Sequence, residues 1–244
     1  MFRVNNRIHN DDWFRNFMTT HSDSKKVCKF LEKYNEFMTK NYKETKNCSF
    51  TDDQTEELIS QLSKIKHNIT NENLCELFYM VWVGYDGENR KELFENFLSF
   101  LETRIKVDDS DEEYTVFRVG TIDGRSWSQN LQSLTSIWNT WVDIDNQFTD
   151  RKRKFLQPRV YKRIIRKSDI LLHSYRNERH ENEFILRKKS LRNNNVSRCD
   201  VVSTREEFYF SDEENVYGVH CKYIDDTPFW IPQNDNWDSL IVNI

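Results

Sequence analysis

The sequence predicts an α+β protein with a helical N-terminal region, residues 1–107, followed by a mainly antiparallel β domain over residues 112–244. Apolar residues recur every three or four positions up to about residue 106, and then alternate with polar residues, as in half-buried strands. Five carboxylates fall among the six residues from Asp108 to Glu113. Because such a block repels itself, it predicts a linker between the two regions.

Four helices are expected in the N-terminal region. The first covers residues 22–42, and the second follows Thr51, whose spacing from Gln54 fits a capping box. The third spans residues 71–83 and the fourth residues 89–106. Their apolar stripes predict the core of a small bundle, an interpretation that we favour over a groove for a partner.

The second region alternates between strand-like stretches and turns, with one helical pattern inside it. Strands are expected at YTVFRVG (114–120), RVYKRII (159–165), EFILRKK (183–189), VVSTREEFYF (201–210) and VYGVHCKYI (216–224). The helical pattern is SLTSIWNTWVDI, residues 133–144.

The bulk composition argues against several classes of protein. A net charge of −4 and a pI near 5.9 give no overall bias toward nucleic acid or an anionic membrane. Five cysteines without a C-x-x-C pair argue against a disulfide framework or a zinc site. The N-terminus lacks the apolar segment of a signal peptide, and no stretch reaches the roughly 18 apolar residues of a membrane span. We therefore expect a cytoplasmic protein that binds no metal.

Two short stretches early in the second region carry side chains suited to binding. In FRVG, Arg118 suits bidentate contacts with phosphate, and Gly120 lets a ligand approach the backbone closely. In GRSWS, Ser126 and Ser128 flank a large aromatic ring just before the expected helix. The alternative interpretations are a solvated arginine on a strand and serines that cap the helix.

A third stretch, ENEFIL at residues 181–186, places two carboxylates at the start of an apolar run. In a β-strand, Glu181 and Glu183 would share one face with Ile185. Two like charges so close together repel each other. The strand therefore either faces water at the edge of a sheet, or uses the two glutamates at a site.

The order of these three stretches resembles the ADP-ribosyltransferases of the R-S-E type. It is similar above all to small phage and bacterial members with a Y-R-G … G-x-S-W-T … E-x-E-hydrophobic pattern. The resemblance covers roughly residues 114–187. It implies that residues 112–244 form a split β-sheet ADP-ribosyltransferase-like domain that binds NAD as a substrate. The implied activity is that of an NAD-dependent mono-ADP-ribosyltransferase, a glycosyltransferase that modifies a protein.

The resemblance also implies a cofactor-binding set on the first two stretches. Arg118 would hold the NAD phosphates or the adenosine ribose, and the backbone at Gly120 would meet the nicotinamide amide. Ser126, Trp127 and Ser128 would complete the set.

The implied catalytic residues are Glu183, Glu181 and Ser126. Glu183 would stabilise the oxocarbenium-like ribose as the bond to nicotinamide breaks, and Ser126 would brace that glutamate. Glu181 would orient or deprotonate the acceptor, which in this family is associated with arginine when a glutamate stands first in E-x-E.

Two departures from the family pattern concern the first and second stretches. FRVG inserts a residue between Arg118 and Gly120, which weakens the assignment of the glycine more than that of the arginine. Serine replaces the commoner threonine after Trp127 and keeps the hydroxyl. The aromatic ring that stacks on nicotinamide is left open among four side chains: Trp138, Trp141, Phe148 and Tyr161.

Codon bias suggests a setting for such an enzyme. The chain has no alanine but 24 asparagines, and helix propensity gives no reason to avoid alanine. An AT-rich genome explains both, as in a virus, a phage or a low-GC bacterium. Combined with the resemblance, this predicts a viral or phage effector that acts on a host protein in the host cytoplasm, with a bacterial toxin as the alternative.

Three rival functions remain open at this stage. The stretch Arg151–Lys167 carries nine basic residues among 17, with aromatic residues between them, which suits a nucleic-acid surface or an acidic partner. The chain could instead be a non-catalytic member of the fold that acts by docking. A third rival is an NAD glycohydrolase, with water as the acceptor. The histidines show no metal-ligand spacing, and His180 is interpreted as an incidental loop residue.

Overall fold

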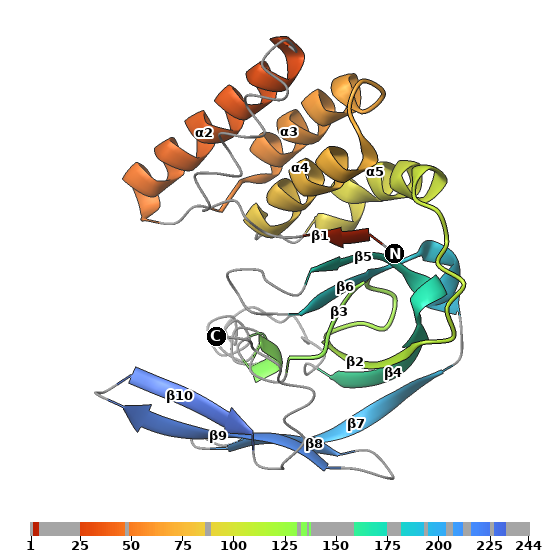
Figure 1. Ribbon diagram of the computed structural model, residues 1–244. Coiled ribbons are helices and arrows are strands. Elements are labelled where there is room, and N and C mark those ends of the chain that lie inside the picture. The colour runs from red at the N-terminus through yellow and green to blue at the C-terminus, as the bar shows by residue number, and fades with distance from the viewer. Residues whose placement is uncertain are drawn as a thin grey trace, which may run out of the picture. The chain divides into compact units, whose positions relative to one another are not determined.

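The computed structural model describes residues 2–4, 25–46, 49–85, 89–130, 133–135, 137, 159–174, 182–192, 195–203, 207–211, 216–224 and 227–232. The chain divides into two compact units, one of Phe2–Lys106 and one that takes in Val107–Ile244. The first is helical and the second is built on an antiparallel sheet, so the predicted α+β class is confirmed at this level (Figure 1).

The helical unit contains all four predicted helices, with ends that differ by a few residues from the expected ones. Its elements are β1 (Phe2–Val4), α2 (Lys25–Thr45), α3 (Asp52–Ile65), α4 (Asn71–Gly84) and α5 (Arg90–Arg104). The predicted capping box is present at the start of α3. The Thr51 hydroxyl accepts from the Gln54 N–H, and the Gln54 side-chain oxygen accepts from the Thr51 N–H.

The core of this unit lies around α4, which contacts α3, α5 and β1. An amphipathic stripe was predicted for this helix, but every residue from Leu74 to Trp82 is buried. The ring of Phe78 stacks on Phe97 at 5.2 Å between centroids and meets Phe94 edge-on at 5.7 Å. A helix buried on all sides is the central element of its unit.

A buried tyrosine ties the end of α4 to the start of α3. The Tyr85 hydroxyl donates to Asp52 Oδ1 at 2.6 Å and accepts from the Asn89 N–H at 2.8 Å. Burial and the bond to Asp52 raise the pKa of Tyr85 from 10.0 to about 12. The same bond, followed by one from Asn89, lowers the pKa of the Asp52 carboxyl.

We expect Tyr85→Phe to destabilise the helical unit by about 1–2 kcal/mol at neutral pH, because it leaves the Asn89 N–H without this acceptor. The raised pKa means that the protonated hydroxyl contributes stability below about pH 10, and that this contribution is lost as pH rises toward about 12. Urea unfolding followed by circular dichroism from pH 7 to 11 should therefore show the difference between wild type and Tyr85→Phe shrink with pH. Tyr42→Phe, at a residue that is 55% exposed, should match the wild type throughout.

The second unit is a sheet in which every pairing between its strands is antiparallel. Its strand order is β5-β6-β3-β2-β4-β7-β8-β9-β10. The elements are β2 (Glu113–Val119), β3 (Ser126–Ser128), β4 (Val160–Arg166), η1 (Lys167–Asp169), β5 (Ile170–Ser174), β6 (Glu183–Leu186), η2 (Lys188–Arg192), β7 (Val196–Ser203), β8 (Glu207–Ser211), β9 (Val216–Ile224) and β10 (Thr227–Pro232). Residues 196–199 of β7 pair with β4, and residues 200–203 pair with β8.

The strands differ from the expected ones in several places. The stretch at 201–210 contains parts of two strands, β7 and β8, and the strand that begins at Glu183 ends at Leu186, where a 3₁₀ helix soon follows. The strands β3, β5 and β10 were not predicted. In β5, ILLHS is a continuous apolar run rather than an alternating one, because all five of its residues are buried.

Each face of the sheet carries its own apolar cluster. One cluster contains the helical residue Leu134 on Phe117, Val119, Val160 and Cys199. The other, on the opposite face, contains Val116, Trp127, Ile165, Ile170, Phe184 and Leu186. Cross-strand pairs share a face in an antiparallel sheet, so Glu183, opposite Ser128, lies on the same face as Phe117.

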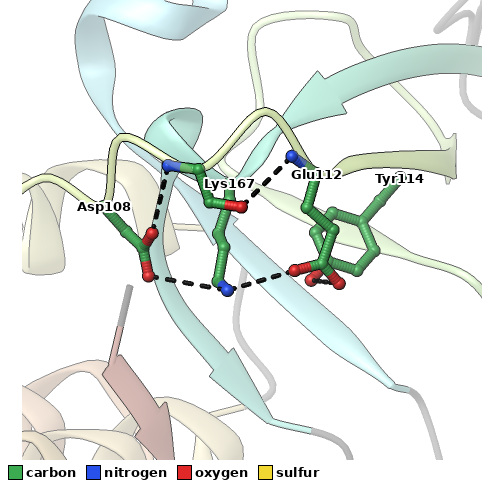
Figure 2. Close-up of polar contacts among 5 residues, drawn as sticks. Asp108, Glu112, Tyr114 and Lys167 are labelled. Carbon is green, nitrogen blue, oxygen red and sulfur yellow. Dashed lines mark hydrogen bonds and ion pairs between the residues drawn. The ribbon is translucent and has the colours of Figure 1, made fainter.

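The acidic segment 107–112 has no regular structure but is held to the sheet by Lys167 (Figure 2). The Lys167 ammonium lies 3.1 Å from the Glu112 carboxylate and 3.7 Å from the Asp108 carboxylate. The backbone N–H of Lys167 donates to the Glu112 carbonyl at 2.9 Å. Tyr114 donates to the Glu112 carboxylate at 2.6 Å. The predicted linker is therefore anchored at Asp108 and Glu112 rather than free, because a cation offsets its self-repulsion.

Candidate functional site

The serine of GRSWS and the second glutamate of ENE meet on neighbouring strands. Ser126 on β3 and Glu183 on β6 are 57 residues apart in sequence, and the Ser126 hydroxyl donates to Glu183 Oε1 in a short hydrogen bond. Glu183 is 2% exposed, so this strand does not simply face water as an edge strand would. A buried carboxylate needs such partners because burial makes an unpaired charge costly.

The residue between the two glutamates is fixed in an unusual backbone conformation. Asn182 has a φ of 43°, in the left-handed region that asparagine tolerates better than most residues. Its side-chain N–H₂ donates to Gln129 Oε1 at 2.9 Å, and its Oδ1 lies 2.8 Å from His173 Nε2. Because Oδ1 is an acceptor, His173 acts as the donor, from Nε2, in this contact.

This turn limits the strand argument made for the two glutamates. The strand β6 begins at Glu183, so the alternation that was expected from Glu181 onward applies only to Glu183 and Ile185. Glu181 itself lies outside the described residues, and its predicted role at the acceptor stays a prediction.

The left-handed turn leads to a prediction at Asn182. We expect Asn182→Gly to be mildly destabilising, because it loses two hydrogen bonds but keeps the backbone angle. Asn182→Val should cost about 2–3 kcal/mol, since a β-branched residue adds strain at this φ. Urea unfolding followed by tryptophan fluorescence would rank the variants. Equal effects of valine and glycine would show that the turn is not strained.

The arginine of FRVG contacts the hairpin between β2 and β3. Arg118 donates from Nε to the Thr121 carbonyl at 2.7 Å and from Nη1 to the Ser126 carbonyl at 2.6 Å. Gly124 leaves room for this guanidinium, because a Cβ at that position would collide with it. Arg118 is thus coupled to Ser126 through the backbone that carries the serine.

Gly120 lies at the end of β2 with a φ of 110°, a conformation that L side chains rarely adopt. Its N–H donates to the Arg159 carbonyl at 2.9 Å. A ligand that meets the backbone here would therefore contact a group other than this N–H. The inserted residue Val119 is buried in the sheet core, which accounts for the extra spacing.

The tryptophan of GRSWS points into the core and not toward Glu183. Trp127 is 1% exposed and donates from Nε1 to the Gly124 carbonyl at 2.9 Å. The guanidinium carbon of Arg163 lies over the indole ring, 4.7 Å from the ring centroid. Its side chain belongs to the apolar cluster on the face opposite Glu183. Alternation along β3 therefore turns the indole ring away from the face that carries Glu183.

The two serines of GRSWS do not cap the following helix, which was the alternative interpretation. Both lie in the strand β3, and Asn130 Oδ1 instead accepts from the Ser133 N–H at 3.4 Å. Ser128 accepts from the Asn130 N–H at 2.9 Å, which orders the turn into that helix. Ser128 therefore holds the backbone that follows β3.

Of the four candidate rings for nicotinamide, only Tyr161 is described. It pairs with Arg118 and packs on the cluster that contains Trp127, on the face opposite Glu183. Tyr161 is therefore poorly placed to stack on a ring held at Glu183. Trp138, Trp141 and Phe148 lie outside the described residues.

The basic stretch 151–167 uses much of its described charge within the chain. Arg163 is 2% exposed and buried against an indole ring. Arg166 and Lys167 form ion pairs with carboxylates of the segment 108–113. These ion pairs leave less positive charge available for phosphates than the sequence suggested. Residues 151–158 of the stretch lie outside the described residues, and so does His180.

Sequence reasoning missed three residues that shape this site, namely His173, Gln129 and Asn182. Asn182 between two glutamates and His173 at a strand end were visible, but no sequence signal pairs residues nine or 53 positions apart. Among the described residues, no group of three or more His, Cys, Asp or Glu side chains could hold a metal. No helix in the described part of the chain has both the length and the apolar character needed to cross a membrane.

Comparisons of the chain with protein-family models, with curated proteins and with solved structures give no significant match. The site can therefore be interpreted only from its own residues. These are a buried carboxylate, a hydroxyl bonded to it and an arginine bonded to the same strand.

Proposed function

We propose that the chain is an NAD-dependent mono-ADP-ribosyltransferase that modifies arginine on a protein. The observation that carries the proposal is the hydrogen bond from Ser126 to Glu183. Residues singled out separately in the sequence as brace and catalytic carboxylate lie on adjacent strands, in contact. Arg118, the third member of the pattern, donates to the carbonyl of that same serine.

The chemistry needs a fixed negative charge beside the ribose. Nicotinamide leaves NAD as a neutral molecule when the glycosidic bond between C1′ and the ring nitrogen breaks. The positive charge of the pyridinium then develops on the ribose. The Glu183 carboxylate, held by Ser126, stabilises that charge in the transition state. An arginine nitrogen then attacks C1′ and passes a proton to the Glu181 carboxylate, the predicted base, which gives ADP-ribosyl-arginine.

Two further roles belong to the proposal. Arg118 keeps the serine strand in place by donating to the Ser126 carbonyl, from the face opposite Glu183 that it shares with its cross-strand partner Tyr161. Its contact with the NAD phosphates stays a prediction. Glu181 would meet the acceptor guanidinium on the far side of the ribose. Since Glu183 is 2% exposed, entry of NAD requires the groups that cover it to move.

The test is incubation of the purified chain with NAD labelled in the adenylate, beside an arginine peptide and its lysine counterpart. Transfer of label to the arginine peptide with release of nicotinamide is expected. Nicotinamide release with no labelled peptide or protein would favour the glycohydrolase alternative. Absence of both, with no binding of NAD, would contradict the proposal and leave a docking protein.

A further inference from the structure

Ser174 is a buried hydroxyl beside Glu183 that the proposed reaction does not yet use. It ends the strand β5, and it pairs in register with Glu183, which pairs in turn with Ser128. Cross-strand partners in an antiparallel sheet share a face, with Cβ atoms roughly 4.5–5.5 Å apart. Ser174, Glu183 and Ser128 therefore form a polar row on one face of three adjacent strands.

The Ser174 hydroxyl has no hydrogen-bond partner among the described residues, although the residue is only 1% exposed. Its neighbours are satisfied, since Ser126 donates to Glu183 and Ser128 accepts from the Asn130 N–H. A buried hydroxyl without a partner lowers stability, whereas an alanine of similar size would not. A buried serine that lowers stability beside a carboxylate indicates that a bound ligand supplies the missing hydrogen-bond partner.

We infer that Ser174 is a ligand-binding residue that hydrogen-bonds the 3′-hydroxyl of the nicotinamide ribose. The inference rests on the proposed function, in which the Glu183 carboxylate lies beside the ribose, where it can accept a hydrogen bond from the 2′-hydroxyl. A ribose carries these two hydroxyls on adjacent carbons. Two polar side chains on adjacent strands, with one a carboxylate and the other a hydroxyl, match such a pair. The row thereby selects a ribose over a 3′-deoxy sugar.

The experiment measures binding of carba-NAD, whose glycosidic bond is not cleaved, by calorimetry to wild type, Ser174→Ala and Ser174→Thr. We expect Ser174→Ala to weaken binding about tenfold, as for the loss of one hydrogen bond to a ligand, and Ser174→Thr to restore most of it. The melting temperature of unliganded Ser174→Ala should equal or exceed that of the wild type. Binding of 3′-deoxy-carba-NAD should be the same for wild type and Ser174→Ala.

Thr55 supplies a matched control, because its hydroxyl is also buried without a described partner but lies in the helical unit. Thr55→Val should leave carba-NAD binding unchanged. Equal affinities of wild type and Ser174→Ala for carba-NAD would overturn this inference but not the proposed function. A lower melting temperature of unliganded Ser174→Ala would also overturn it, because it would reveal a hydrogen-bond partner of Ser174 within the chain. An equal loss with the 3′-deoxy ligand would overturn the assigned hydroxyl. A wild type that binds no carba-NAD would overturn the proposed function and, with it, this inference.

Discussion

Glu183→Gln is expected to lower the rate of nicotinamide release from NAD by about 10²–10³-fold, the usual effect of removing one group that stabilises transition-state charge. The amide has nearly the same shape as the carboxylate, and its oxygen can still accept from Ser126. The negative charge is lost, and one acceptor oxygen becomes an N–H₂ donor. The melting temperature should not fall, because the variant buries a neutral group where the wild type buries a charge.

Glu113→Gln is the matched control, because the Glu113 side chain is 52% exposed and forms a surface ion pair with Arg166. Its rate should match the wild type, since exposed ion pairs contribute little. Single-turnover assays at saturating NAD would separate the chemical step from binding. If Glu183→Gln retained the wild-type rate, Glu183 would be a structural residue and the proposed function would be wrong.

The sequence predicted the elements whose signals are local. Four helices follow from apolar periodicity, and the capping box follows from Thr51 and Gln54 alone. The strand β2 and its arginine also follow from alternation. The contact between Ser126 and Glu183 was also predicted, but only through the resemblance to a family pattern and not through spacing.

The remaining features depend on partners that are distant in sequence. A strand of three residues, such as β3, has too little periodicity to be recognised, and its neighbours β2 and β6 define it through hydrogen bonds. The burial of α4 on all sides depends on α3 and α5. The left-handed turn at Asn182 depends on His173 and Gln129, which contact it only in the folded chain.

Gly124→Ala should lower the rate of nicotinamide release by up to about 10²-fold, although it removes no functional group. A methyl group at Gly124 would occupy the space of the Arg118 guanidinium, which must move. Arg118 would then lose its bonds to the carbonyls of Thr121 and Ser126. A displacement of about 1 Å near a reacting centre can have an effect of this size.

The same mechanism predicts non-additive effects, because Gly124→Ala and Arg118→Lys disturb one contact. Lysine lacks the fork of donors that reaches two carbonyls, so Arg118→Lys should lower the rate by itself. The double variant should be little worse than the poorer single variant. Ile122→Val, on the same hairpin and 47% exposed, should match the wild type. Additive losses would mean that Gly124→Ala changes the backbone conformation and does not act by displacing Arg118.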